Sequence, residues 1–473
     1  MPELTAQSRV EAPVEEVFAW HERPGALDRL MPPWAGVQVL ERRGGLRDGD
    51  RVVLEVRKGP LRCRWYARHF DYEAGRRFCD EQVEGPFAEW VHMHDFLPHE
   101  AGGCLLRDRV RYRLPLGAVG ALIAGRDIRK QLTRVFGHRH RTVREDLLRH
   151  GRFSDRGSLR IAITGASGLV GRALDAYLGG GGHSVWRVVR RATQPDAPEI
   201  GWNPAAGSIE RSKLEGIDAV IHLAGENIAA GRWTTQRKQA IRNSRVLSTE
   251  LLARTLADLD ARPRVLVCAS AVGYYGHRGD EPVDESAAAG DGFLADVCRQ
   301  WEAASEPARE AGIRVVNLRL GMVLAVSGGA LPRMLTPFKW CLGGPVGTGR
   351  QQVSWIASED LVGCVEHALF NDTLAGPVNA TSPQPVSNRE FVRTLGQVLR
   401  RPTVARMPAA VVRLLFGQMG TELLLSGVRA MPGRLQSSGF AFLYPDLVSA
   451  LRRELGLFDF HAERAAGTEI HFA

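Results

Sequence analysis

The pattern of apolar and polar positions divides the chain into three segments. In the first, up to about residue 150, the stretch ELTAQSRVEAP alternates as a strand does, and Pro13 precedes a short helical pattern, VEEVFAWH. Further β-like runs separated by Gly, Pro and Asp predict an antiparallel meander: RVVLEVRK, RCRWYARHFDY, FAEWVHMHDFLP and GCLLRDRVRYRL. A long helix, RDIRKQLTRVFGHRHRTVREDLLRH, closes the segment, with an apolar face of Ile128, Leu132, Val135, Phe136, Val143 and Leu147.

The second segment opens with a glycine-rich turn between a strand and a helix. The apolar strand 161–163 runs into the glycines of TGASGLVG, and a helical pattern begins at about Leu169. The first glycine allows the tight turn, the second lets a phosphate approach the backbone, and the third lets the helix pack on the strand. The free N–H groups of the helix N-terminus favour an anion. The pattern therefore predicts a dinucleotide site at Gly165, Ser167, Gly168, Leu169, Val170 and Gly171.

The next strand, HSVWRVVRR, indicates which dinucleotide binds. It ends in Arg190 and Arg191 rather than in the Asp or Glu that accepts hydrogen bonds from the ribose of NAD. A guanidinium pairs with a 2′-phosphate, so NADP(H) is the expected cofactor. The alternative is that both arginines are merely solvated at the end of a strand.

Polar stretches and helix start and stop signals indicate the domain boundaries. The polar, glycine-bearing stretch GRFSDRGS predicts a linker at 151–158, between a ligand-binding domain at 1–150 and a nucleotide-binding domain at 159–384. A C-terminal domain is expected at 385–473, where one helix has a start signal at Asn388 and a stop at Pro402. The apolar stretch PAAVVRLLFGQMGTELLLSG is too short and glycine-broken to span a membrane, which favours a lid or homodimer packing.

Composition narrows the class of protein. A chain of 473 residues, 44% hydrophobic and 24% charged, is typical of a soluble protein of two or three domains. Seven scattered cysteines without a CxxC pair argue against disulfides and zinc, and the start has no secretory signal, so a cytoplasmic location is expected. The net charge of +9 comes from dispersed arginines, which suits anionic ligands such as phosphates rather than nucleic acid. His138 and His140 are interpreted as an exposed pair on an Arg-rich helix, and no metal site is predicted.

Residues 3–149 resemble the START-like (SRPBCC, polyketide cyclase) family in their pattern of strands and final helix. The resemblance implies an α+β helix-grip fold, in which a curved sheet wraps the last helix around a pocket for an apolar ligand. Inward-facing aromatic residues that simply fill a core are the alternative.

Residues 159 to about 460 resemble the extended short-chain dehydrogenase/reductases, and within them the atypical "epimerase family" oxidoreductases. The motifs that carry this resemblance are TGASGLVG, DAVIHLAGENIAAGRWT, IRNSRVLSTELL, SAVGYYG, LRLGMVLAVSGGALPRML, GGPVGTGRQQVSWIASEDL and GPVNATSP. It implies an α/β Rossmann-type, doubly wound parallel sheet with a small C-terminal domain. It also implies further cofactor contacts at Leu223, Ala224, Gly225, Glu226, Arg245 and Val323, and a catalytic hydroxyl at Ser270.

One departure from the superfamily pattern concerns catalysis. The helix FLADVCRQWEAA should carry a Tyr and, four residues later, a Lys, but Leu294 and Cys298 stand there. Tyr274 or Tyr275 could donate the proton instead, with Arg245 supplying the positive charge, and Cys298 could act as a weak acid or nucleophile. The alternatives are that the tyrosines only pack the loop and that Cys298 is a buried filler.

The leading hypothesis is an NADP(H)-dependent oxidoreductase or epimerase that acts on a small-molecule substrate, with an accessory domain for a hydrophobic ligand. A non-catalytic NADPH-binding sensor is the first rival, favoured by the missing Tyr and Lys. A lipid or hydrophobic-ligand carrier is the second.

Overall fold

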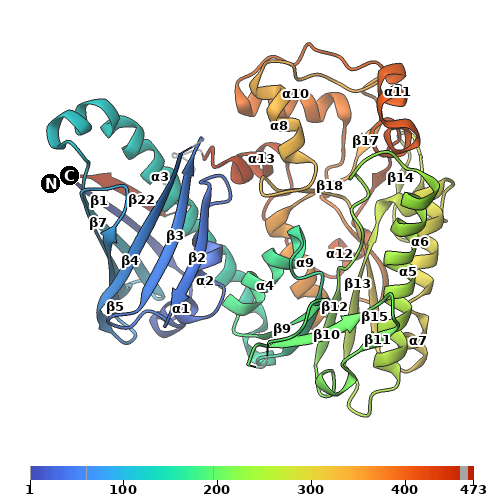
Figure 1. Ribbon diagram of the computed structural model, residues 1–473, viewed down its shortest axis with the longest axis horizontal. Coiled ribbons are helices and arrows are strands. Elements are labelled where there is room, and N and C mark those ends of the chain that lie inside the picture. Colours follow the sequence, from blue (N-terminus) through green and yellow to red (C-terminus); the bar gives the residue numbers. More distant parts are fainter. Residues whose placement is uncertain (1, 60, 195, 459–466) are drawn as a thin grey trace. The chain divides into compact units, whose positions relative to one another are not determined.

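The computed structural model describes residues 2–59, 61–194, 196–458 and 467–473, which fall into two units. The first comprises residues 1–157, 176–182 and 453–473, and the second comprises 158–175 and 183–452. In Figure 1 the first unit carries the blue strands, and the second carries the strands drawn from green to orange.

The first unit is built on an eight-stranded antiparallel sheet. Its strand order is β2-β3-β4-β5-β6-β7-β1-β22. The elements of this unit are β1 (Glu3–Val10), α1 (Val14–Glu22), α2 (Ala26–Leu30), β2 (Val37–Arg43), β3 (Arg51–Lys58), β4 (Leu61–Glu73), β5 (Arg77–Glu84), β6 (Glu89–Pro98), β7 (Cys104–Arg113), α3 (Gly117–His150) and β22 (Thr468–Phe472). The predicted meander and closing helix are present, and α3 begins nine residues before the predicted start, 126 − 117, after Leu116 in a left-handed conformation.

Alternation along the strands sends one set of side chains toward α3, where two apolar clusters form. One cluster contains Phe18, Phe78 and Phe96, and the other contains Trp90, Tyr112 and Phe136. On four elements a polar residue stands between members of the two clusters: Ser8 on β1, His92 and His94 on β6, Asp108 on β7 and His140 on α3. The inner face therefore holds a buried polar layer between the two apolar clusters, which neither the expected pocket for an apolar ligand nor the alternative aromatic core predicts.

The polar layer carries strong electrostatic interactions. Burial alone would lower the pKa of His94, but Asp108 and Asp80 reverse this effect and raise it to about 9. Burial opposes ionisation of Asp108, yet His94, His140 and His92 hold its pKa well below the usual range. These residues form one coupled network rather than separate buried groups.

The expectation of an exposed His138–His140 pair is wrong, because both imidazoles are buried. Two residues along a helix correspond to a rotation of about 200°, so the two side chains leave opposite faces of α3. His140 Nδ1 lies 2.8 Å from Ser8 Oγ on the sheet side. His138 contacts the ring of Trp34 and the guanidinium of Arg453 on the other side. Burial and the charge on Arg453 lower the pKa of His138 well below its usual value.

The C-terminal strand belongs to the first unit. β22 pairs antiparallel with β1, from Leu4 opposite Phe472 to Ser8 opposite Thr468, and Figure 1 shows the red β22 alongside β1. The sequence predicts one C-terminal domain over 385–473, whereas residues 453–473 cluster with the N-terminal sheet. Without β22, the backbone of β1 would form an unpaired sheet edge.

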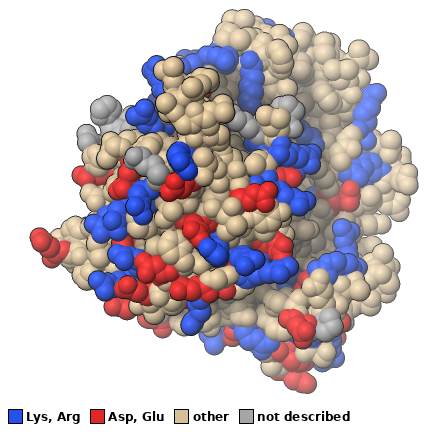
Figure 2. Space-filling view, turned by 60° about the vertical axis from the view of Figure 1, so that its left-hand side comes forward, with Lys and Arg blue, Asp and Glu red and all other residues tan. Residues whose placement is uncertain are grey.

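Charged side chains of both signs cover the face shown in Figure 2, where blue and red residues are interspersed. On the sheet of the first unit, Arg68 pairs with Glu81 across neighbouring strands. The buried Asp95 carboxylate accepts hydrogen bonds from three arginines: Arg77, Arg107 and Arg109. These four arginines therefore neutralise carboxylates on the same sheet.

The second unit contains an eight-stranded sheet of order β11-β10-β9-β8-β12-β13-β15-β19, parallel except for β11. Its strands are β8 (Arg160–Thr164), β9 (Ser184–Val189), β10 (Glu199–Asn203), β11 (Ser208–Ile209), β12 (Ala219–His222), β13 (Val265–Ala271), β15 (Arg314–Leu320) and β19 (Gly376–Ala380). The connecting helices are α4 (Leu169–Gly180), α5 (Thr235–Ala257), α6 (Phe293–Ala303), α7 (Glu306–Glu310), α8 (Leu331–Lys339) and α9 (Ser358–Phe370). The strand order reverses direction between β8 and β12, so a crevice for a dinucleotide is expected at their carboxyl ends.

The chain from 385 to 452 folds back onto the second unit through two small sheets, β14–β21 and β17–β20. Its elements are β20 (Val386–Ser387), α10 (Asn388–Leu399), α11 (Ala409–Gly420), β21 (Arg429–Ala430), α12 (Gly433–Ser437) and α13 (Leu447–Leu455), and the strand partners are β14 (Pro282–Val283) and β17 (Gln352–Val353). Two further short strands of the second unit, β16 (Met322–Leu324) and β18 (Trp355–Ala357), pair with each other. Ser387 caps α10 by accepting a hydrogen bond from the Glu390 N–H, one residue before the predicted start. None of the described helices has the length and apolar character needed to cross a bilayer.

Candidate functional site

The glycine-rich turn joins β8 to α4 and leaves no room for side chains on its inner side. Gly165 has φ +68°, and a Cβ atom there would lie 2.9 Å from the carbonyl carbon of Leu223. A Cβ on Gly171 would lie 2.2 Å from the Gly165 oxygen, so the helix packs on the turn only because residue 171 is a glycine. The Gly168 N–H donates to the Gly165 oxygen at 2.9 Å, while the Ser167 side chain is exposed. This is a backbone cradle of the kind that accepts a pyrophosphate.

The end of β12 is tied to the turn through Thr164. Its Oγ accepts hydrogen bonds from the N–H groups of Leu223 and Ala224 at 3.1 and 3.2 Å. The same hydroxyl lies 2.7 Å from Nδ1 of His222, and burial lowers the pKa of this histidine to about 4, so its ring is neutral. These hydrogen bonds thus hold the HLAG motif against the glycine-rich turn.

Two further predicted cofactor positions lie at this edge. Arg245 on α5 reaches the crevice, since a Cβ on Gly225 would lie 3.3 Å from its Cζ atom. Glu226 orders the loop after β12: its backbone N–H donates to Ser244 Oγ, and its Oε1 lies 2.8 Å from Arg237 Nη1.

Val323 lies on the short strand β16, and the loop after it crosses the nucleotide turn. A Cβ on Gly328 would lie 3.2 Å from Leu169 Cδ1, and one on Gly329 would lie 3.4 Å from Leu169 Cδ2. Residues 328 and 329 therefore pack against Leu169 at the start of α4, and the cofactor contact at Val323 stays a prediction.

The two arginines after β9 have different surroundings. Arg191 is paired with Glu199, with Nη1 2.9 Å from Oε2. Arg190 is exposed, and none of the described hydrogen bonds or ion pairs includes it. The Arg190 guanidinium is thus accessible to a 2′-phosphate. Arg191 would first have to break its ion pair with Glu199.

Replacement of Arg190 by alanine is expected to weaken NADPH binding about 10- to 100-fold, the contribution of one charge-assisted hydrogen bond. NADH lacks the 2′-phosphate, so its affinity should not change. Fluorescence titration with both nucleotides checks this expectation, with Arg254→Ala, an exposed arginine on α5, as the control. Equal weakening of NADPH and NADH binding would contradict the assignment.

A buried polar network surrounds Ser270 at the end of β13. The Ser270 hydroxyl donates to Glu302 Oε1 at 2.7 Å, and Arg319 forms a two-pronged pair with the same carboxylate, each contact 2.8 Å long. Arg319 Nη1 also donates to the Tyr275 hydroxyl at 2.9 Å, and that hydroxyl donates to Asn379 Oδ1 at 2.7 Å. Glu302 and Arg319 therefore connect Ser270 to the tyrosine loop.

The two tyrosines that follow Ser270 differ in exposure. Tyr275 is fully buried, and burial raises the pKa of its hydroxyl. Tyr274 is half-buried, and its hydroxyl has no hydrogen bond to another described residue. Its ring faces Arg319, whose Cζ lies 3.5 Å from the ring centroid. The positive charge beside the tyrosine thus comes from Arg319, whereas Arg245, the predicted source, stacks on Trp301 at 5.0 Å.

The α6 positions of the missing Tyr and Lys lie next to this network. Leu294 and Cys298 both lie within 4 Å of the position of a Cβ on Gly273. Cys298 is buried, and desolvation raises the pKa of its thiol to about 12. A neutral thiol of this kind is a poor nucleophile.

Comparisons with known proteins give the family. The model described as the NAD dependent epimerase/dehydratase family matches residues 161–379. An epimerase family protein of Mycobacterium tuberculosis is 45% identical over 291 residues, which cover 62% of this chain and 96% of that protein. The chain belongs to the epimerase family.

Two solved structures of epimerases resemble the chain. Human epimerase family protein SDR39U1, crystallised with NADPH, is 34% identical, with a TM-score of 0.58 over 63% of this chain and all of that one (100%). A nucleoside-diphosphate sugar epimerase from Corynebacterium glutamicum is 35% identical, with a TM-score of 0.79 over 98% of this chain and 92% of that one.

The parts outside the epimerase core also match family models. Residues 10–136 match "Polyketide cyclase / dehydrase and lipid transport", and residues 407–454 match a domain of unknown function, DUF1731. The resemblances to an epimerase family oxidoreductase and to a START-like domain are confirmed, and so is the predicted fold class.

Sequence reasoning missed Glu302, Arg319 and Asn379 as members of the site of this epimerase family chain. The Glu302 carboxylate on α6 contacts both Ser270 and Arg319. One signal was present, since Arg319 lies within the mostly apolar stretch VVNLRL and a buried arginine needs a carboxylate.

Proposed function

We propose that the chain is an NADP(H)-dependent oxidoreductase or epimerase whose cofactor binds in the crevice between β8 and β12. The backbone cradle at Gly165, Gly168 and Gly171 carries this proposal, because a Cβ at any of these positions would press on the backbone of the turn or of the segment after β12. Only glycines allow this tight turn and close helix packing, which place backbone N–H groups where a pyrophosphate binds. The exposed Arg190 and the NADPH in the human relative support NADP(H) over NAD(H). The finer cofactor contacts are the predicted ones at Ser167, Leu169, Val170, Leu223, Ala224, Gly225, Glu226, Arg245 and Val323.

The residues proposed for proton transfer are Ser270 and Tyr274. When bound, NADP(H) supplies or accepts a hydride. The Tyr274 hydroxyl has no hydrogen-bond partner among the described residues, and Arg319 against its ring stabilises negative charge on the phenol when the proton leaves. Glu302 holds Arg319 in place and orients the Ser270 hydroxyl. We do not assign proton transfer to Tyr275, whose hydroxyl is occupied on both sides, or nucleophilic attack to Cys298, whose thiol stays protonated.

Replacement of Tyr274 by phenylalanine is expected to lower kcat roughly 10²-fold, the lower end of the usual contribution of a proton donor, and to leave the Kd for NADPH unchanged. The assay is NADPH oxidation by the full chain with a panel of sugar-nucleotide ketones, aldehydes and other carbonyl compounds. Tyr66→Phe, on β4 of the first unit, is the matched control. An unchanged kcat in Tyr274→Phe would remove Tyr274 from the mechanism.

The missing Tyr–Lys pair on α6 supports a second candidate, a non-catalytic NADPH-binding sensor. Both candidates predict saturable NADPH binding. Only the enzyme consumes NADPH in the presence of a carbonyl compound, so binding without turnover across the panel would favour the sensor.

All seven cysteines are free thiols, which supports the proposal of a reducing compartment such as the cytoplasm.

A further inference from the structure

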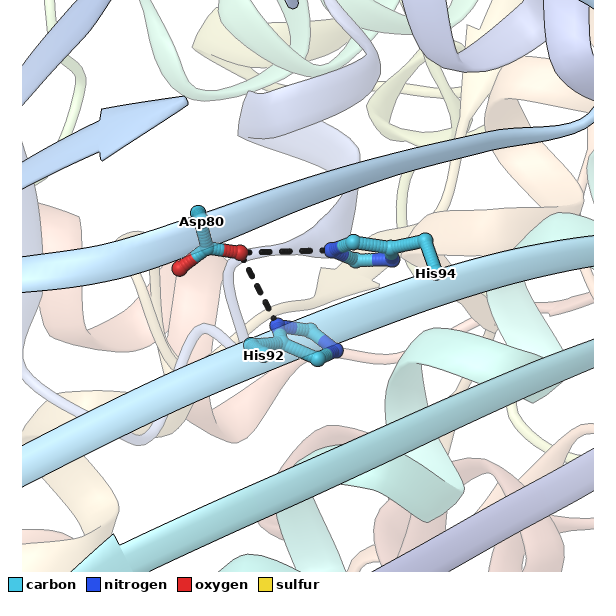
Figure 3. A group of neighbouring side chains, drawn as sticks. All are labelled: Asp80, His92 and His94. Carbon is cyan, nitrogen blue, oxygen red and sulfur yellow. Dashed lines mark hydrogen bonds and ion pairs between the residues drawn. The ribbon is translucent and has the colours of Figure 1, made fainter. Parts of the chain in front are cut away.

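The polar layer of the first unit brings one carboxylate and two imidazoles together. Asp80 on β5 lies directly opposite His92 on β6, and His94 follows two residues later on the same face of β6. Asp80 Oδ2 is 3.1 Å from His92 Nδ1 and 3.3 Å from His94 Nε2, as the dashed lines in Figure 3 mark. One ligand atom from each residue lies within 4.8 Å of the other two.

These separations fit a metal ion at the centre of the group. Zn²⁺ binds imidazole nitrogen and carboxylate oxygen at about 2.0–2.2 Å, so neighbouring ligand atoms in a tetrahedral site lie roughly 3.3–3.6 Å apart. The two Asp80–imidazole separations are within a few tenths of an ångström of this range. Small side-chain rotations would therefore suffice to coordinate the ion.

Asp108 faces the far side of both imidazoles. Its Oδ1 lies 2.8 Å from His94 Nδ1 and 3.3 Å from His92 Nε2, and its Oδ2 lies 3.0 Å from His140 Nε2. A carboxylate behind a ligating imidazole takes the outer N–H and turns the lone pair of the other nitrogen toward the metal. With a metal bound, both inner nitrogens would be acceptors beside the Asp80 carboxylate, and the cation would take the place of the protons that now lie between these groups.

The fold itself gives no reason for this group of residues. The layer lies between two apolar clusters, and the side chains of His92, His94 and Asp108 are only 2%, 9% and 5% exposed. Apolar residues of similar volume would form this core at no electrostatic cost. Buried charged groups retained at such a position are typical of a functional site.

We propose that Asp80, His92 and His94 bind a first-row divalent transition-metal ion, with Asp108 as the carboxylate that orients both imidazoles. Two histidines and one carboxylate are a ligand set used for Zn²⁺ and for non-haem Fe²⁺. Three protein ligands leave a coordination position for water or a small ligand, the arrangement of catalytic rather than structural metal sites. At 17% exposure, Asp80 is the most accessible of the three ligands. The sequence predicts no metal; the proposed site belongs to the first unit, whereas the proposed nucleotide crevice belongs to the second.

The test uses the untagged full chain, stripped with a chelator and titrated with Zn²⁺ by calorimetry and with Co²⁺ by visible absorption. We expect one ion per chain and Co²⁺ bands of a low-coordinate site with nitrogen ligands. His94→Gln and Asp80→Asn should lose this binding, and Asp108→Asn should weaken it about 10- to 100-fold. His99→Gln, on the exposed turn after β6, is the control and should bind as the unmodified chain does.

Circular dichroism distinguishes loss of the metal site from loss of the fold in each variant. If His94→Gln or Asp80→Asn does not fold, the Co²⁺ spectrum of the unmodified chain decides alone. Zn²⁺ binding that survives in both folded ligand variants would overturn the proposal, as would an unmodified chain without Co²⁺ bands. In that case the layer is a proton-bridged structural network.

Discussion

Replacement of Glu302 by alanine is expected to lower the free energy of unfolding of the second unit by about 3–5 kcal/mol, the cost of removing one partner of a buried ion pair. Arg319 is only 3% exposed and makes both of its short carboxylate contacts with Glu302. Burial disfavours its charge, yet the carboxylate more than compensates and raises the pKa of Arg319, so the guanidinium stays charged. Without Glu302 this charge would be buried without a counterion. Urea unfolding followed by circular dichroism measures the change.

The matched control for this experiment is Glu306→Ala on α7. Glu306 pairs with Arg309 in the same region of the chain, but both side chains are 45% exposed. An exposed pair contributes little, so the loss should stay within about 0.5 kcal/mol. A Glu302→Ala variant as stable as Glu306→Ala would mean that the Ser270–Glu302–Arg319 network is not rigid enough to position Tyr274.

Replacement of Gly171 by alanine is expected to reduce NADPH affinity at least about 100-fold, equivalent to losing one or two hydrogen bonds to charged phosphate oxygens. The new Cβ would lie 2.2 Å from the Gly165 oxygen and 2.7 Å from Ala166 Cα. Both neighbours are backbone atoms, so α4 and the turn must separate and the cradle must open. Equilibrium titration with NADPH measures the effect.

Gly151→Ala is the control for this substitution, because a Cβ there meets nothing within 4 Å. It should bind NADPH as the unmodified chain does. Normal NADPH binding by a folded Gly171→Ala variant would show that the nucleotide does not use this cradle.

Local patterns in the sequence were sufficient to predict the bounds of several elements, including the start of the helix that follows the nucleotide turn. The predicted helix start at Leu169 is the observed start of α4, and RVVLEVRK is the observed β3. These predictions work because hydrophobic period and glycine geometry are set by neighbours along the chain. The position of β22 could not be predicted in this way, since its partner β1 lies at the other end of the chain.

The residues of the two candidate sites were also hard to predict, because each depends on partners that are distant in the sequence. The His-x-His pattern of FAEWVHMHDFLP on a strand places both imidazoles on one face, and this signal was not used. Its meaning depends on Asp80 and Asp108, which the sheet register brings opposite His92 and His94. Likewise the sequence does not distinguish Tyr274 from Tyr275. The Tyr275 hydroxyl is buried and bonded to Asn379 and Arg319, and both of these residues are distant in the sequence.

The central claim is that this epimerase family chain binds NADP(H) in the crevice between β8 and β12 and uses it for hydride transfer. The most direct measurement is mass spectrometry of the small molecules extracted from the gently purified full chain, followed by titration of the stripped chain with NADPH. The account predicts bound NADP(H) and saturable rebinding that Gly171→Ala loses. A chain that carries no nucleotide and gives a flat NADPH titration would contradict it.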